Sequence, residues 1–224
     1  MDWYPLYNSI RVAAISTVLV FLLGIPAAYG ASRVRPWGRA LLDVVLSLPL
    51  ALPPTVTGWL LLSLLGPHRF LGGWLYAATG ARLVMHWWSA VFAGTLAALP
   101  LMYRAARLAF SRFDENLADA ARTLGRSNGW ILWRIRLPLC RRGLLAGAVL
   151  SFARAAGEYG ATYMVAGYTP GRTATLGTAV YRLWQADNQA GALVWVLASL
   201  LLSALLLLTL YLLENPPEGG APWN

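Results

Sequence analysis

The sequence contains no lysine, a single cysteine and few charged side chains of any kind. Charged residues make up 12% of the 224 residues, whereas an ordinary soluble domain carries roughly 25%. Hydrophobic residues make up 58%. Because one soluble core cannot bury so much apolar surface, the surplus requires lipid as its solvent. The composition therefore predicts an all-α integral membrane protein and argues against a soluble enzyme.

Cysteine and histidine are too scarce to build a disulfide framework or a metal centre. Cys140 is the only cysteine, so no internal disulfide can form. His68 and His86 lie far apart and have no cysteine neighbours, so the spacing of a zinc site is absent. We expect no metal ligands in this chain.

Five apolar runs approach the ~20 residues that cross a bilayer as a helix. Their ranges are 10–31, 41–65, 84–101, 144–166 and 191–213. Arg33, Arg35 and Arg39 follow the first run, whereas a signal peptide has its basic residues before the apolar stretch. We therefore expect the first run to remain as a spanning helix. The polar stretches 66–83 and 167–189 are expected to be loops.

The arginines are distributed unevenly between the two sides of the membrane. Twelve of the 18 lie in the loops after the first and third runs, five lie on the other side, and Arg154 lies inside a run. Arginine excess marks cytoplasmic loops, so the N-terminus is expected outside and the C-terminus inside. This clustering argues against a nucleic-acid partner. We expect one membrane domain over 1–213 and a disordered tail over 214–224.

The second run contains three prolines, Pro49, Pro53 and Pro54. Each removes a backbone donor and interrupts the helical ladder. In hydrocarbon, such a break survives only where protein or a water-filled path satisfies the freed groups. Pro53 and Pro54 are therefore candidates for a translocation path or gate. A packing kink is an equally good explanation for any single proline.

The polar loop 103–143 predicts a pair of short amphipathic helices. Ser111 with Asp114 has the spacing of a capping box, and Gly125 is a plausible C-terminal stop. A second helix is expected over 130–135, ended by Pro138. The expected apolar stripe of the first helix consists of Phe113, Leu117, Ala120, Ala121 and Leu124. Such a helix could lie on lipid, pack on its own protein or dock into a groove of a partner; the pattern leaves these alternatives open.

The same loop resembles the cytoplasmic signature of the permeases of ABC importers. That signature reads E-A-A, three residues, G, nine residues, I-x-L-P. The matching positions are Asp119, Ala120, Ala121, Gly125, Ile135, Leu137 and Pro138. Asp119 replaces the glutamate, which keeps the carboxylate on a side chain one methylene shorter. Six identical positions over twenty residues are far more specific than a lone E-A-A.

Further stretches resemble the oxyanion permeases, and molybdate permeases most of all. They are Leu41-Leu42-Asp43, Leu48-Pro49-Leu50, Leu52-Pro53-Pro54 with Gly58, Ser151-Phe152-Ala153-Arg154, Gly157-Glu158-Tyr159-Gly160-Ala161-Thr162, and Pro170-Gly171-Arg172-Thr173 with Tyr181. Sulfate and tungstate permeases share the Gly-Glu-Tyr/Phe-Gly element. The resemblance covers nearly the whole chain and implies the type I permease fold of ABC importers.

The resemblance also implies how such a chain works. Two permease chains would surround a path for molybdate, tungstate or sulfate. They are expected here to form a homodimer in the lipid of a bacterial or archaeal inner membrane. Cytoplasmic ATPase subunits would dock on the matching loop residues, and a periplasmic or extracellular oxyanion-binding protein would deliver the anion. This chain has no phosphate loop of the G-x-x-x-x-G-K-[ST] type. ATP and Mg²⁺ are therefore expected on the ATPase alone, and this chain is expected to hold no cofactor and to catalyse nothing.

Arg154 and Glu158 lie four residues apart inside the fourth run, and so on one helical face. Ionisable groups within a span usually face an interior or a cavity. Arg154 either supplies positive potential to a passing anion or forms a structural ion pair with Glu158; the second interpretation is favoured, because a tightly paired arginine makes a poor anion site.

Two other function classes fit a polytopic membrane protein. A non-transporting scaffold would lack an ATPase partner. A lipid-modifying enzyme would need a catalytic cluster at interface depth, and no such His-Asp-Ser or Cys-His set is found in the sequence.

Overall fold

The computed structural model describes residues 2–215, and every regular element in that range is helical. The expected disordered tail lies outside the described residues from position 216 onward. In chain order, the elements are α1 (Tyr4–Ala31), α2 (Pro36–Ala51), α3 (Pro54–Leu65), α4 (Phe70–Thr79), α5 (Trp87–Ser111), α6 (Glu115–Thr123), α7 (Asn128–Ile131), the π-helical turn η1 (Leu132–Arg136), α8 (Leu137–Ala156), α9 (Gly160–Ala166), α10 (Leu176–Gln185) and α11 (Gln189–Glu214). The all-α class is confirmed.

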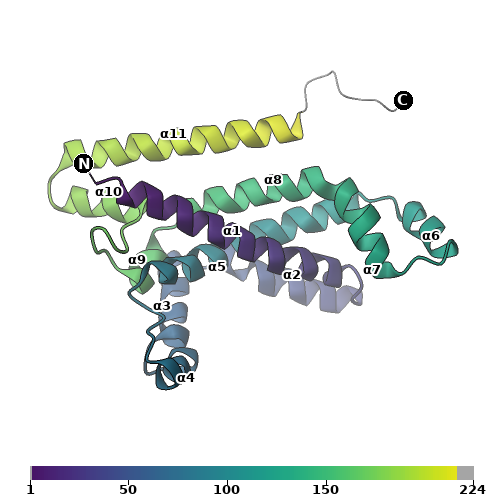
Figure 1. Cartoon of the computed structure of the whole chain (residues 1–224), viewed down its shortest axis with the longest axis horizontal. Coiled ribbons are helices and arrows are strands. Elements are labelled where there is room, and N and C mark those ends of the chain that lie inside the picture. Colours follow the sequence, from purple (N-terminus) through teal and green to yellow (C-terminus); the bar gives the residue numbers. More distant parts are fainter. Residues whose placement is uncertain (1, 216–224) are drawn as a thin grey trace.

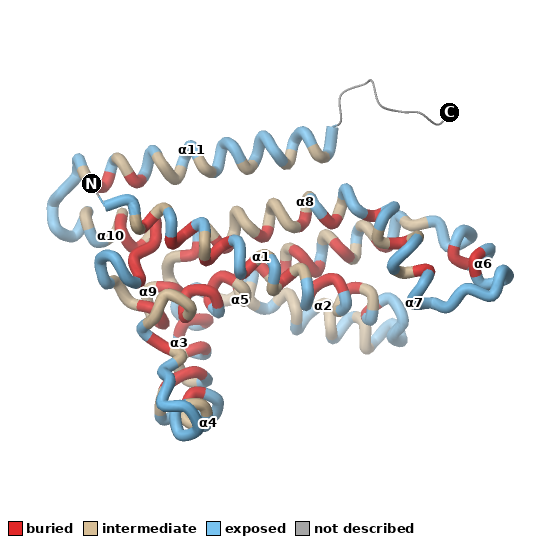
Figure 2. Tube along the Cα trace, in the orientation of Figure 1, coloured by how far each residue is buried: buried red, intermediate tan, exposed pale blue. Residues whose placement is uncertain are grey.

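Helices α1, α5 and α8 form the centre of the bundle, where most buried residues lie (Figures 1 and 2). Small residues allow these helices to approach closely, as is usual in membranes. A Cβ on Gly147 of α8 would lie 2.5 Å from the Ala105 Cβ on α5. One on Gly94 of α5 would lie 2.7 Å from the Ser16 Oγ on α1. Helices α2 and α11 lie outside this centre, and α2 has no buried residue.

Three helices, α1, α5 and α11, are long and apolar enough to cross a membrane. Helices α2 and α3 meet at an angle of 108° at their break, and they add a fourth span if the pair crosses the membrane once. The remaining expected span corresponds to α8, whose 20 residues include Arg141, Arg142 and Arg154 and fall short of that test. Length and composition thus support three or four of the five expected spans. The break in the proline-rich second run is confirmed.

The sequence predicted a single helix over the fourth run, 144–166, and this prediction is wrong. Helix α8 begins earlier, at Leu137, and ends at Ala156, and α9 begins at Gly160. At the break, the buried Glu158 side chain accepts a hydrogen bond from the Ala161 amide at 3.0 Å and so supports the first turn of α9.

Two stretches that were expected to be loops contain helices. Helix α4 occupies part of 66–83, and α10 occupies part of 167–189. Thr175 and Thr178 form a capping box that starts α10. A Cβ on Gly72 in α4 would lie 2.0 Å from the Leu65 carbonyl oxygen, so this glycine permits close packing against α3.

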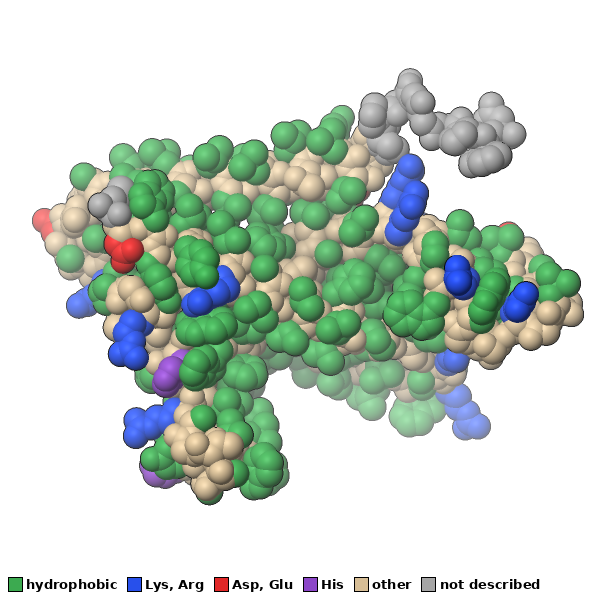
Figure 3. Space-filling model, in the orientation of Figure 1, with side chains coloured by type: hydrophobic (Ala, Val, Ile, Leu, Met, Phe, Trp, Pro, Cys, Tyr) green, Lys and Arg blue, Asp and Glu red, His purple; other side chains and the backbone are tan. Residues whose placement is uncertain are grey.

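The two arginine-rich loops meet at one end of the molecule. Arg39 from the first loop and Arg107 and Arg136 from the second line a polar cavity of about 230 Å³. At the other end, the Asn8 side chain donates to the Ala174 carbonyl at 2.9 Å. Basic side chains gather toward both ends, and hydrophobic side chains cover the long sides between them (Figure 3). This arrangement agrees with helices that cross a bilayer along the long axis of the molecule.

Candidate functional site

Helix α6 lies at the arginine-rich end of the molecule (Figure 1). The helix and the residues that directly follow it carry the first half of the signature. The sequence predicts a capping box at Ser111, and this prediction is wrong. Ser111 is the last residue of α5, and its hydroxyl donates to the Leu108 carbonyl at 2.9 Å. The N-cap is Asp114, whose carboxylate accepts from the Asn116 amide at 3.0 Å. A capping aspartate also complements the positive end of the helix dipole.

Gly125 ends α6 as predicted. Its φ is +75°, in the left-handed region that L side chains rarely adopt. The Arg126 amide donates to the Ala121 carbonyl at 3.0 Å, and the Gly125 amide donates to the Arg122 carbonyl at 2.9 Å. These two bonds form a Schellman motif, which fixes where α6 stops.

The expected apolar stripe of α6 is divided between two faces. The inner face forms a small cluster of Ala118, Ala121 and Ile131 with the partly buried Phe113 and Ile135. Leu117 is 45% exposed, Leu124 is 80% exposed, and Ala120 is also exposed. Asp119 faces solvent and forms an ion pair with Arg122. The helix thus packs on its own protein with one face and leaves a second apolar face uncovered.

The second expected helix does not end at Pro138. Helix α7, η1 and α8 follow one another without interruption, and Pro138 lies in the first turn of α8. The Leu137 amide donates to the Leu132 carbonyl, five residues earlier, which widens the helix just before the proline. The π-turn thus accommodates a residue that has no amide hydrogen. Leu137 is partly buried against the main core, and Pro138 is exposed.

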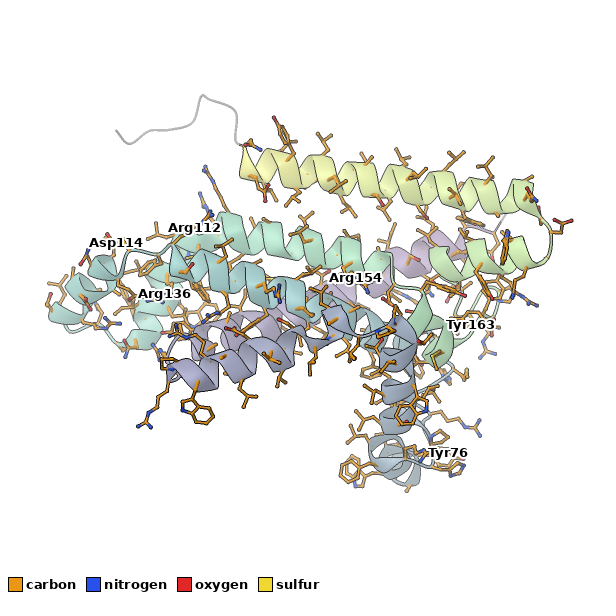
Figure 4. The ribbon with its side chains drawn as sticks, turned by 180° about the vertical axis from the view of Figure 1, so that it is seen from behind. Tyr76, Arg112, Asp114, Arg136, Arg154 and Tyr163 are labelled. Carbon is orange, nitrogen blue, oxygen red and sulfur yellow. The ribbon has the colours of Figure 1, made fainter. Side chains whose placement is uncertain are left out.

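Arg136, the variable position of the signature, is a residue that the sequence reasoning missed. It is buried, and its guanidinium pairs with Glu115 at 2.5 Å. The guanidinium carbon lies 4.5 Å from the centre of the Phe113 ring and 5.6 Å from that of Tyr29 on α1. Figure 4 places Arg136 with Asp114 near α6. No sequence signal links Glu115 with Arg136, because their pairing depends on the folded loop.

Arg154 and Glu158 form the expected ion pair, with 2.7 Å between the guanidinium nitrogen and the carboxylate oxygen. The Glu158 side chain is only 3% exposed and that of Arg154 is 32% exposed. Arg154 lies in the body of the bundle, away from Arg136 (Figure 4). Since Glu158 also holds the first turn of α9 through Ala161, the pair stabilises the break between α8 and α9.

Pro53 and Pro54 lie exposed at the start of α3. A Cβ on Gly160 of α9 would lie 2.6 Å from the Pro54 Cβ, so the two helix breaks are neighbours. The structure therefore brings Pro54 close to the segment of Glu158, although the two sites are far apart in sequence. It does not bring either of them to the signature residues around α6.

A polar contact between α2 and α5 was also missed by the sequence reasoning. Asp43 accepts a hydrogen bond from the Tyr103 hydroxyl at 2.5 Å and lies 3.5 Å from the Arg107 guanidinium. The Arg104 Nε donates to the Ser47 hydroxyl at 3.1 Å. These bonds hold α2 against α5, together with Leu42 and Leu46, which pack partly buried against the core.

Comparison with curated proteins gives relatives along most of the chain. The molybdenum transport system permease protein ModB of Escherichia coli K12 is 39% identical over 92% of this chain and 91% of the relative. The putative molybdenum transport system permease protein YvgM of Bacillus subtilis is 38% identical over 91% and 89%. The sulfate transport system permease protein CysW of a Synechocystis strain is 35% identical over 89% and 72%.

Solved structures share the fold at low sequence identity. A chain of the MetNI methionine ABC transporter in an inward-facing conformation matches with a TM-score of 0.66 at 15% identity, over 94% of this chain and 95% of that chain. A chain of a bacterial alginate ABC transporter matches with a TM-score of 0.72 at 16% identity, over 95% and 77%. The predicted fold of an ABC importer permease is thereby confirmed. The family model described as binding-protein-dependent transport system inner membrane component matches residues 20–215, and the chain belongs to that family.

Proposed function

We propose that this chain is the permease subunit of an ATP-driven importer of a tetrahedral oxyanion, and that the oxyanion is molybdate. Family membership and two molybdenum permeases at 38–39% identity support the proposal. The sulfate permease relative is less similar, at 35% identity, and the match covers 72% of that relative's length. Sulfate or tungstate import is therefore the alternative. Uptake of labelled molybdate by proteoliposomes of the whole complex, in competition with sulfate and tungstate, tests this choice.

The uncovered face of α6 is the observation that supports coupling to an ATPase. Leu117, Ala120 and Leu124 are exposed on a short helix whose ends are fixed by Asp114 and Gly125. An amphipathic helix with one free apolar face fits a hydrophobic groove on a partner. The ATPase subunits would dock on this face in the cytoplasm, which requires the N-terminus outside and the C-terminus inside.

The substrate path is proposed to lie beside the two neighbouring helix breaks. Irregular backbone at membrane depth is tolerated where it lines a cavity or is buried in protein. In many transporters, discontinuous helices form the substrate site. Pro53 and Pro54 at one break and Glu158 at the other supply such backbone, and a second permease copy would complete the path. A binding protein outside the membrane would supply the affinity, because a path that releases its anion binds weakly.

Gly125→Val is expected to weaken co-purification of the ATPase roughly tenfold or more. A β-branched residue at φ +75° costs of order 1–3 kcal/mol, and α6 would lose its fixed end. Gly129→Val is the matched control: a side chain there also meets open space, but the backbone has no positive φ. The measurement is the ratio of ATPase to permease after affinity purification. Equal ratios for the two variants would contradict the role of α6.

A further inference from the structure

A groove of about 830 Å³ runs along the outer side of α5 and α8 and reaches the end of α11. Small residues of α5 and α8 form its floor, where the two helices approach each other closely. A Cβ on Gly143 would lie 3.0 Å from the Ala109 Cβ, and one on Gly147 would lie 2.5 Å from that of Ala105. The floor of the groove therefore follows from the close packing of α5 against α8.

The walls of the groove are apolar and uncovered. Leu108 is 54% exposed and Leu139 is 61% exposed, and Leu101, Leu150 and Leu213 line the same groove. In a membrane protein, such a surface faces acyl chains or another hydrophobic segment.

The rim of the groove at the arginine-rich end is basic. Arg104, Arg112 and Arg142 line it. Two acidic residues, Asp114 and Glu214, also line it, but Asp114 already caps α6 through the Asn116 amide. Among the described residues, neither Arg112 nor Arg142 forms an ion pair. The groove therefore joins an apolar floor to guanidinium groups that can take an anion.

We propose that this groove binds an anionic phospholipid, with its phosphate on Arg112 and Arg142 and an acyl chain along α5 and α8. Basic pockets between membrane helices recognise anionic lipid headgroups in this way. A free oxyanion would use the arginines but not the apolar floor. A second copy of this chain, placed groove to groove about a two-fold axis, would bring Arg112 and Arg142 of the two copies together, which like-charge repulsion opposes.

Native mass spectrometry of the permease–ATPase complex, purified in detergent with added phosphatidylglycerol or phosphatidylcholine, tests the proposal. The complex is expected to retain phosphatidylglycerol selectively, and Arg112→Gln with Arg142→Gln is expected to weaken this binding roughly thirtyfold. Arg134→Gln with Arg141→Gln removes the same charge from exposed positions outside the groove and is expected to change little. Millimolar inorganic phosphate is expected to displace no lipid.

Three results would overturn the proposal. The first is equal retention of the neutral and the anionic lipid. The second is equal binding by the two double variants, with thermal midpoints in detergent showing that both are folded. The third is efficient cross-linking between copies through Leu108→Cys in a Cys140→Ser background, which would place a second copy in the groove.

Discussion

Arg154→Met is expected to lower the yield and thermal midpoint of the purified permease sharply, and Glu158→Gln in the same chain is expected to restore most of both. Removing Arg154 leaves the Glu158 carboxylate, 3% exposed, without its cation. Breaking a buried pair in this way costs about 3–5 kcal/mol, and the low end applies here because Arg154 is one-third exposed. The glutamine amide oxygen can still accept from the Ala161 amide, so the start of α9 is kept.

The double variant separates the structural role of the pair from a role in transport. If Arg154 serves only to neutralise Glu158, the restored double variant takes up molybdate at close to the wild-type rate in proteoliposomes. Arg182→Met, which removes an exposed arginine from α10, controls for the loss of one positive charge. A stable double variant with uptake reduced tenfold or more would instead assign Arg154 to the anion path. A single variant as stable as the wild type would refute the structural interpretation.

The signature was a reliable guide to α6 because its residues act locally. Gly125 stops the helix wherever the loop lies, since a left-handed φ depends on one residue and its neighbours. The proline-rich second run predicted a break for the same reason, and the helix does break before Pro54. The prediction failed where two local signals competed. Both Ser111 and Asp114 are suitable caps, and the length of α5 decided between them.

Long-range packing explains what the sequence could not predict. Pro138 was expected to end a helix, but the π-turn before it allows the helix to continue into α8. Glu158 pairs with Arg154 as the spacing predicted, yet its bond to Ala161, which divides the fourth run, became visible only in the structure. Arg136 is separated from Glu115 by 21 residues, and no periodic pattern connects them.

Arg136→Met is expected to reduce molybdate uptake per ATP hydrolysed roughly tenfold while leaving the ATPase bound. Arg136 connects α6, through Glu115, with Tyr29 on α1 and with its own helix, η1, which continues into α8. Rigid-body alternation requires a stiff element between the ATPase and the membrane helices. Methionine keeps the apolar packing beside Phe113 but removes the ion pair. Glu115 is 57% exposed, so its free carboxylate can be hydrated and the fold is retained.

Arg134→Met is the matched control, because Arg134 is exposed two residues away and carries the same charge. Glu115→Gln should reproduce the defect of Arg136→Met, and the double variant should be no worse than either single variant, since both remove one interaction. Uptake and ATP hydrolysis are measured together in proteoliposomes. If uptake and ATP hydrolysis fall in proportion, the variant has lost docking of the ATPase and not the coupling of ATP hydrolysis to the membrane helices. If Arg136→Met matches Arg134→Met in uptake per ATP, α6 moves the membrane helices without this ion pair. The cluster around Ala121 and Ile131 and the hydrogen bond from Arg122 to Asn128 are then contacts that could carry the motion.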